Sequence, residues 1–297
     1  MSTDTLMGLM GFALRLSASV DILAAIGAKL QLQQAGTDGD PRVHALLHDI
    51  IRATDPRMLD GIDDSQGATA IALIRAIFRQ AMDLLDNPGR EAGWTYRDSE
   101  ILQTQGQISR LIVRSINTLA AQRSDFRSIL QRPGAFLDVG TGTGWLAIEA
   151  ARSWPSLRVV GIDPWEPALA LARQNLAASG LAERVEVRLQ RVEELDEAST
   201  YTLVWIPGPF IGAKVGGRAL PLIRRALKPG GWLIFGLNAP PPGPLEEAIA
   251  NLRVVRWGGH LWKPDEVKER LRALEFEEIE TFPPGGPIAF VIGRRVG

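Results

Sequence analysis

The stretch "AFLDVGTGTGWLAIEAA", residues 135–151, says more about the fold than any other part of the sequence. An apolar run of strand length ends at Val139, and a helix-like run begins near Trp145. The turn between them holds three glycines at alternate positions, Gly140, Gly142 and Gly144. Glycine allows a positive φ and lets a ligand approach the main chain without meeting a Cβ. Because the free N–H groups at a helix start attract anionic groups, the stretch predicts a small-molecule cradle; a glycine-rich turn without a ligand is the alternative.

The spacing of this turn separates it from two other nucleotide-binding loops. A dinucleotide fingerprint needs a glycine where this chain has Trp145, and a phosphate loop needs a lysine and a hydroxyl residue that are absent here. The next predicted strand ends in "GIDPW", which places Asp163 roughly 20 residues downstream, where a carboxylate accepts hydrogen bonds from ribose hydroxyls. We therefore expect a ligand with a ribose and a short anionic tail. A helix N-cap ahead of Pro164 is the structural alternative for Asp163, and the two roles are compatible.

The organisation of the chain changes near Pro133. A helix is predicted over about 100–121, with Asp98 or Ser99 as its cap. After Pro133, apolar runs of strand length alternate with helical stretches, which predicts a mostly parallel, doubly wound sheet covered on both faces. The last segments, "LEFEEIETF" and "PIAFVIGRR", joined by "PPGGP", predict a closing antiparallel strand pair. We therefore predict an all-helical domain over 1–132 and an α/β domain over 133–297.

Composition limits the class of protein. With 297 residues, of which 45% are hydrophobic, the chain can bury a substantial core. A net charge of −1 provides no general basic field, so we expect no nucleic-acid partner. The absence of cysteine excludes disulfides, thiolate metal sites and a cysteine nucleophile, and it suits a cytoplasmic protein.

The apolar start of the chain, residues 1–30, needs separate treatment. It lacks the basic region of a signal peptide, and Arg15 and Asp21 interrupt it before the roughly 20 apolar residues that a membrane span needs. We therefore expect an amphipathic helix and no membrane association. Such a helix docks on its own domain or on a partner subunit, and we expect a homodimer through the N-terminal helices.

Residues from about 135 to 297 resemble the class I S-adenosylmethionine-dependent methyltransferases. "LDVGTGTG" is similar to the first motif of that family, "VVGIDPW" to its acidic second-strand motif, and "ALKPGGWLIFG" to its fifth-strand motif. The resemblance implies a Rossmann-like domain that binds S-adenosylmethionine, releases S-adenosylhomocysteine and uses no metal. It implies that Asp138 and Gly140 lie near the methionine end, Gly142 near the ribose, and Asp163 on the ribose hydroxyls. The further cofactor contacts that we predict are Thr141, Gly144, Pro164, Trp165, Gln190, Arg191, Val192, Pro207 and Gln105.

One position departs from the family pattern. After the third strand, members often carry an acidic residue that accepts a hydrogen bond from the adenine amino group, whereas this chain has Gln190 and Arg191. A guanidinium cannot accept a hydrogen bond. Gln190, a backbone carbonyl and Glu193 stay open as the adenine contact.

The wall beside the fourth strand, "VWIPGPF", indicates the methyl acceptor. Members that methylate base amines place Asn or Asp before Pro-Pro-aromatic, whereas this chain has Ile206 and Gly208 in those places, which disfavours DNA as acceptor. Trp205 and Phe210 instead predict a flat aromatic face for a planar ring. Burial of Trp205 under the helices is the alternative.

Two further segments supply candidate substrate contacts. "GWTYRDSEILQTQG", residues 93–106, resembles the connector of a bacterial natural-product group whose helical N-terminal region folds over the cleft, and it offers Trp94 and Tyr96. A surface loop is the alternative. His260 in "WGGHLWKP" is a candidate base or substrate contact, with a loop-stabilising hydrogen bond as the alternative. His44 and His48 have metal-ligand spacing, but no carboxylate pattern completes a site.

The function that we predict is methyl transfer to a small, aromatic or heteroaromatic metabolite, indole-like in some relatives, at O, N or C. The reaction is an in-line displacement, so positioning does most of the catalysis and a base is optional; Tyr96 and His260 are the candidates. One alternative is a methyltransferase that acts on RNA or protein. Another is a non-catalytic partner subunit with this fold, for which the departure at Arg191 is the hint.

Overall fold

The computed structural model describes residues 3–240, 242–282 and 288–297, which divide into two compact units, Met1–Pro88 and Gly89–Gly297. The described part of the first unit is helical. Its helices are α1 (Thr3–Ala35), α2 (Pro41–Thr54) and α3 (Asp64–Asp86). Asp40 caps α2, and Asp63 caps α3 in a reciprocal capping box with Gln66, so short polar side chains fix both helix starts.

Helix α1 is apolar over most of its length. Its later turns bury Ala25 and Leu30, whereas its first half exposes large apolar side chains. These exposed residues are Leu6, Met7, Leu9, Met10, Phe12, Leu14, Leu16 and Val20. Among the described residues, the segment Thr5–Ala35 is the one helix whose length and composition would suffice to cross a membrane, a property that buried core helices and signal sequences share.

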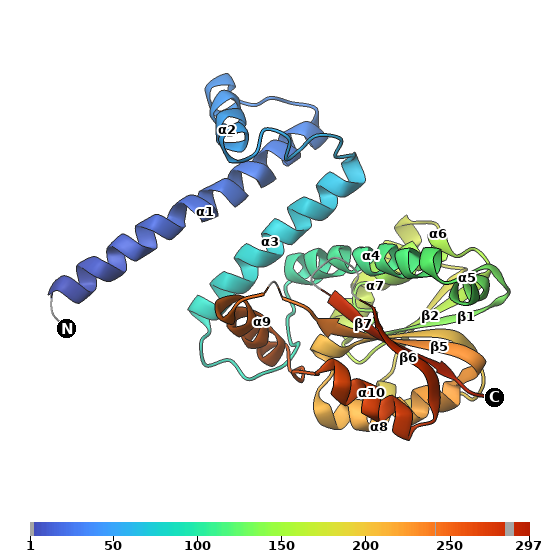
Figure 1. The fold of residues 1–297 in the computed structure, drawn as a ribbon. Coiled ribbons are helices and arrows are strands. Elements are labelled where there is room, and N and C mark those ends of the chain that lie inside the picture. Colours follow the sequence, from blue (N-terminus) through green and yellow to red (C-terminus); the bar gives the residue numbers. More distant parts are fainter. Residues whose placement is uncertain (1–2, 241, 283–287) are drawn as a thin grey trace. The chain divides into compact units, whose positions relative to one another are not determined.

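The second unit is a seven-stranded sheet with helices on both faces (Figure 1). Its strands are β1 (Gly134–Val139), β2 (Leu157–Asp163), β3 (Val185–Leu189), β4 (Tyr201–Pro207), β5 (Leu227–Asn238), β6 (Phe276–Phe282) and β7 (Ile288–Arg295). Its helices are α4 (Ser99–Gln122), α5 (Ser124–Gln131), α6 (Trp145–Ser153), α7 (Glu166–Ala178), α8 (Ala213–Ala226), α9 (Pro244–Arg256) and α10 (Pro264–Ala273), with short 3-10 turns η1 (Val192–Glu194) and η2 (Gly208–Phe210).

The strand order is β3-β2-β1-β4-β5-β7-β6, and β1 to β5 run parallel while β7 is antiparallel to β5 and β6. The predicted doubly wound sheet with a closing antiparallel strand is therefore confirmed. The predicted turn "PPGGP", residues 283–287, lies outside the described residues.

Successive side chains of the central strands lie alternately in two hydrophobic cores, one on each face of the sheet. Phe136 of β1 and Trp205 of β4 lie in the core beneath α4 and α6, whereas Leu137 of β1 and Val204 of β4 lie in the core beneath α8 and α10. Successive side chains of a strand point to opposite faces, so a central strand that is apolar throughout is buried on both faces. Figure 1 shows α4 to α7 on one side of the sheet and α8 and α10 on the other.

The division into units differs from the predicted boundary at 132/133. Helices α4 and α5 belong with the sheet, because the apolar side of α4 is buried in the sheet's own core. Ile112, Ile116 and Leu119 are at most 5% exposed there. Asp98 caps α4 through hydrogen bonds from the N–H groups of Glu100 and Ile101, as predicted.

The order of the sheet determines where a ligand can bind. From β1 the chain proceeds outward to β2 and β3 on one side, and then returns to β4 and β5 on the other. The crevice outside the carboxyl ends of β1 and β4 is therefore the topological switch point, where open α/β sheets bind ligands. Both the glycine turn after β1 and the segment after β4 lie at this edge.

Candidate active site

The glycine loop connects β1 to α6 in the conformation that the sequence predicts. Gly140, Gly142 and Gly144 have φ of 69°, 57° and 79°. A Cβ at Gly140 would lie 3.2 Å from Pro207 Cγ and one at Gly144 would lie 3.2 Å from Ala172 Cβ, whereas at Gly142 the nearest atom is Gly140 O at 4.0 Å. The loop is therefore closed on two sides by protein and open at Gly142.

Asp163 at the end of β2 holds this loop in place. Its Oδ2 accepts a hydrogen bond from the Gly142 N–H at 2.8 Å, and its Oδ1 accepts one from the Trp165 N–H at 2.8 Å. The second bond makes Asp163, two residues ahead of the N-cap Trp165 of α7, an acceptor that stabilises the turn into this helix. The carboxylate thus has a structural role, and each oxygen keeps a further lone pair for a ligand hydroxyl.

Asp138 at the end of β1 is the more deeply buried carboxyl group. It is 1% exposed, and its Oδ2 accepts a hydrogen bond from Thr141 Oγ1 at 2.7 Å. Its Oδ1 and the hydroxyl of Thr143 are buried without a hydrogen-bond partner among the described residues. Burial raises the pKa of Asp138 to about 7 and that of Asp163 to about 6. A cationic or hydrogen-bond-donating group beside Asp138 would favour its ionised form.

The segment after β3 lies beside Asp163. The Gln190 N–H donates to the Asp163 carbonyl at 3.1 Å, while its side chain donates to the Glu194 carbonyl at 3.1 Å. The Arg191 N–H donates to the Glu194 carboxylate, and Val192 is buried. The side-chain NH₂ of Gln190 is thus engaged within its own turn, and its side-chain oxygen is the group that could accept a further hydrogen bond.

An aromatic cluster joins three distant segments of the second unit. Trp94 contacts Tyr96, Phe210 and Trp257 edge to face, with ring centroids 5.0, 5.1 and 6.2 Å apart. Phe210 and Trp257 stack at 4.7 Å and 10°. Two predicted substrate residues from the connector thus lie together with the predicted Phe210, and Trp257 completes the cluster. Because these rings pack on one another, they do not form an open slot for a planar ring.

Tyr96 is fixed from both ends. Arg90 lies over its ring, and Arg90 Nη2 donates to the phenolic oxygen at 3.2 Å. The Tyr96 carbonyl accepts a hydrogen bond from Trp165 Nε1 at 2.7 Å. Since Trp165 directly follows Asp163-Pro164, this bond ties the connector to the ribose side of the predicted cofactor site.

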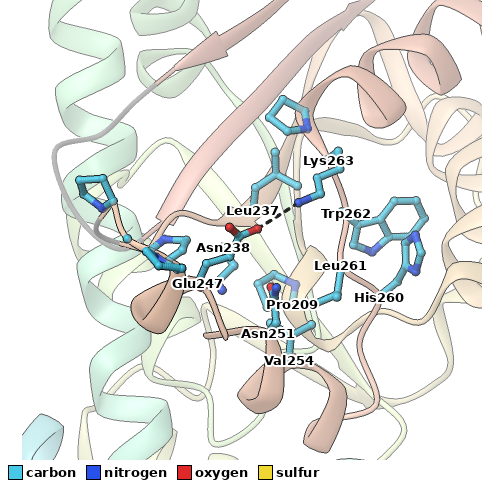
Figure 2. Close-up of a pocket in the computed structure, with 15 residues that line it drawn as sticks. Pro209, Leu237, Asn238, Glu247, Asn251, Val254, His260, Leu261, Trp262 and Lys263 are labelled. Atoms are coloured by element: carbon cyan, nitrogen blue, oxygen red, sulfur yellow. Dashed lines mark ion pairs between the residues drawn. The ribbon is translucent and has the colours of Figure 1, made fainter. Parts of the chain in front are cut away.

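A cavity of about 580 Å³ opens at the carboxyl ends of β4 and β5. Its polar lining comes from Asn238, Glu247, Asn251, His260 and Lys263. Figure 2 shows the ion pair between Lys263 Nζ and Glu247 at 3.6 Å across the middle of the view, with His260 beside Trp262 at one side. His260 Nε2 lies 3.3 Å from the Glu266 carboxylate, so the imidazole is oriented by an acid.

Trp205 is not at this surface, and the structure corrects its prediction as a substrate contact. It is 4% exposed and packs edge to face on Phe290 at 5.6 Å, with its ring against Gly236. The reason is the position of β4 between β1 and β5, where both faces of the strand are covered. The structural alternative for Trp205 was the right one.

Two residues beside the glycine loop were missed as site residues. Gln103 of α4 and Asn175 of α7 form a reciprocal amide pair, and Asn175 also donates to the Thr143 carbonyl at 2.8 Å. The predicted Gln105 lies on α4 two residues beyond Gln103. The available signal was the mid-helix asparagine in "ARQNLAA", because asparagine is a poor helix former away from the ends. Among the described residues no cluster of three or more His, Asp or Glu could hold a metal.

The sequence of this chain is similar to those of known methyltransferases. Residues 136–231 match the family model described as "Methyltransferase domain". A malonyl-(acyl-carrier protein) O-methyltransferase of Halalkalibacterium halodurans is 27% identical over 128 residues, 43% of this chain and 46% of that protein. A ubiquinone/menaquinone biosynthesis C-methyltransferase UbiE of Geobacter sulfurreducens is 32% identical over 162 residues, 50% of this chain and 61% of that protein. The matches thus span about half the length of these relatives.

A solved structure extends the likeness to the whole chain. Human N-acetylserotonin methyltransferase in complex with SAM matches with a TM-score of 0.66 at 13% identity, over 97% of this chain and 98% of that chain. At this identity the likeness establishes the fold. The chain therefore has the fold of the class I S-adenosylmethionine-dependent methyltransferases, and its residues 136–231 match a methyltransferase domain. The match includes the helical N-terminal region of this chain as well as its sheet.

Proposed function

We propose that this chain transfers the methyl group of S-adenosylmethionine to a small molecule. The observation that carries the proposal is the arrangement across the switch point. Asp138, the glycine loop and Asp163 lie at the carboxyl ends of β1 and β2, and the cavity lies at the carboxyl ends of the adjacent β4 and β5. A cofactor on one side and an acceptor on the other would meet at the boundary between β1 and β4.

The residues at the β1 and β2 ends fit the cofactor chemically. Asp138, whose Oδ1 is buried without a partner among the described residues, suits a cationic amine, and Asp163 suits the two hydroxyls of a ribose. The positive φ and open side of Gly142 allow a ligand to approach the backbone. When bound, S-adenosylmethionine supplies a methyl group on a sulfonium, with a good leaving group already attached. Gln190 is the side chain that we assign to the adenine.

The acceptor that we propose is aromatic or heteroaromatic. The cavity is lined by Leu237, Val254 and Trp262 together with the amides of Asn238 and Asn251. Apolar walls with a few placed polar groups are typical of small-molecule sites. Similar proteins named above act on N-acetylserotonin and in quinone biosynthesis, which supports a ring-bearing metabolite, as in natural-product biosynthesis.

Catalysis would rest mainly on alignment. Positioning two reactants alone contributes on the order of 7–11 kcal/mol in favourable intramolecular cases. Where the acceptor needs deprotonation, His260 is the base that we assign, because it lines the cavity and Glu266 orients it. Tyr96, whose hydroxyl oxygen accepts from Arg90, holds the connector in place.

We also propose that the protein is a cytoplasmic homodimer that associates through its N-terminal helices. The apolar side chains that the first half of α1 exposes support association with a second copy. Sedimentation velocity at micromolar concentration tests it, since a monomer would contradict the proposal. Recovery of the protein in the membrane fraction would contradict the location.

The test of the proposed activity is direct methyl transfer. The purified full-length chain is incubated with S-adenosylmethionine labelled in its methyl group and with a panel of phenols, indoles, quinols and aromatic amines. Label in an extracted small-molecule product supports the proposal. Label on ribosomal RNA or protein from a lysate and not on any panel member would support the macromolecular alternative.

A further inference from the structure

We propose that the amide pair Gln103–Asn175 is a positioning element that sets the conformation of the glycine loop, and through it the cofactor affinity. Its effect on affinity rests on the proposed function, whereas its effect on the loop does not. Neither side chain was predicted to contact the cofactor, and both act through backbone and indole groups of the loop.

The hydrogen bonds of the pair have a defined polarity. Gln103 Oε1 accepts from Trp145 Nε1 at 2.7 Å and from Asn175 Nδ2 at 3.0 Å. Asn175 Nδ2 also donates to the Thr143 carbonyl at 2.8 Å, and Asn175 Oδ1 accepts from Gln103 Nε2 at 3.0 Å. The oxygen at position 103 therefore receives two bonds, and the nitrogen at position 175 gives two.

These bonds end on both flanks of the last glycine in the loop. Thr143 precedes Gly144 and Trp145 follows it as the first residue of α6. A residue in left-handed backbone conformation is stable only when its surroundings determine it, and Gly144 has φ 79°. The pair fixes the Thr143 carbonyl before this glycine and the Trp145 side chain after it. It therefore holds the turn that sets the direction of the N–H groups in the loop.

Helix α4 also approaches the loop too closely for a larger residue. A Cβ at Gly106 would clash with Thr143 Oγ1 and lie 3.1 Å from Trp145 Cδ1. The helix that carries Gln103 is thus in direct contact with the loop. The connector at residues 89–98 leads into this helix, and the Tyr96 carbonyl binds Trp165 beside Asp163. The segment 94–106 consequently contacts both cofactor-binding turns, and Gln103 is its contact to the glycine loop.

The experiment compares Asn175→Ala with a matched control, Asn117→Ala. Asn117 of α4 accepts a hydrogen bond at Oδ1 from Trp154 Nε1 at 2.8 Å, so the control removes an asparagine amide that binds the opposite end of α6. In the ligand-free proteins, hydrogen–deuterium exchange is measured over the peptide that contains residues 140–145. We expect faster exchange there in Asn175→Ala and unchanged exchange in Asn117→Ala.

Calorimetric titration with S-adenosylhomocysteine gives the second readout. Loss of three part-buried hydrogen bonds predicts a Kd raised roughly tenfold or more in Asn175→Ala, and a Kd within about twofold of wild type in Asn117→Ala. The direction of these hydrogen bonds also predicts how two acidic variants rank in affinity. Gln103→Glu still accepts both hydrogen bonds and should retain most of the affinity for S-adenosylhomocysteine. Asn175→Asp can no longer donate either of its hydrogen bonds and should lose most of that affinity.

The outcomes separate the two claims. Unchanged loop exchange and unchanged Kd in Asn175→Ala overturn the inference, as does an equal weakening by Asn117→Ala, which would mean general destabilisation of α4. A wild-type protein that binds no S-adenosylhomocysteine contradicts the proposed function and the effect on affinity. The exchange result then still decides whether the pair holds the loop.

Discussion

Asp163 at the end of β2 accepts a hydrogen bond of 2.8 Å from the backbone N–H of Gly142, in the loop that follows β1. This bond joins the two turns that the sequence singles out as the cofactor site. It means that the same carboxylate shapes the loop and faces its open side. On the proposed function, loop geometry and ligand binding would therefore be coupled through one acidic side chain.

Replacement of Gly142 by alanine tests the loop with a matched control at Gly180. Both residues have left-handed backbones, with φ of 57° and 67°, and neither Cβ would meet a protein atom closer than 4.0 Å. Both variants should lose about 1–2 kcal/mol of stability, because a left-handed backbone disfavours a Cβ. Only Gly142→Ala should weaken S-adenosylhomocysteine binding, by more than tenfold in calorimetry. Equal affinities for the two variants would show that the ligand does not approach Gly142.

Stability of the ligand-free protein should fall as pH rises. Burial raises the pKa of Asp138 to about 7 and that of Asp163 to about 6, above the ordinary value of 3.8. Between about pH 4 and 7 the folded state then holds protons that the unfolded state releases, so the unfolding free energy decreases with pH, by on the order of 1 kcal/mol per pH unit for each proton.

Asp138→Asn isolates this effect. Asparagine keeps an acceptor for Thr141 Oγ1 and removes the ionisation. We expect the Tm difference between Asp138→Asn and wild type to grow from pH 5 to pH 7.5 and then to level off. A difference that is constant over this range would show that Asp138 is ionised throughout, with an ordinary pKa.

His260→Ala should lower kcat, provided that the acceptor needs deprotonation. General-base catalysis contributes typically 10²–10⁴-fold, so a loss of kcat in this range is expected. Glu266→Gln, which keeps a hydrogen-bond partner for the imidazole, should have a smaller effect. Tyr96→Phe should change kcat by less than tenfold, because the ring keeps its packing on Trp94. An unchanged kcat in His260→Ala would leave alignment as the mechanism.

Trp205→Leu distinguishes a core residue from a substrate contact. Because Trp205 is 4% exposed and packs on Phe290, its truncation should cost about 2–4 kcal/mol of stability in denaturant unfolding. The acceptor KM should stay within about twofold of wild type. A stable variant with a strongly raised KM would restore the original prediction of a substrate role.

Much of the sheet could be predicted because its signals are local. Mainly apolar runs such as "AFLDV" identify buried parallel strands, and glycines directly after a strand leave little choice of backbone. Asp163 could be found for the same reason, since the end of a strand fixes its position on the sheet edge. These features need no knowledge of which helix packs on which face.

The features that the sequence did not reveal depend on partners distant in the chain. The apolar pattern of α4 predicts that one face of the helix is buried, but it does not predict that this face packs on the sheet. For this reason the predicted boundary between the two domains lies at Pro133, whereas the two units of the structure divide after Pro88. Trp205 is buried because helices cover both faces of β4. This burial can be predicted only once the strand order is known to place β4 between β1 and β5. The Gln103–Asn175 pair joins residues 72 positions apart, and neither residue type in a helix predicts the other.

The most direct test is a calorimetric titration of the purified protein with S-adenosylhomocysteine, repeated on Asp163→Ala and on Asp163→Asn as a variant of the same shape. Micromolar binding by wild type that both substitutions weaken by at least tenfold is the predicted result, because the carboxylate that we assign to the ribose also holds the Gly142 N–H. Absence of binding to folded wild-type protein, or equal binding by all three proteins, would contradict the assignment of this crevice as the cofactor site.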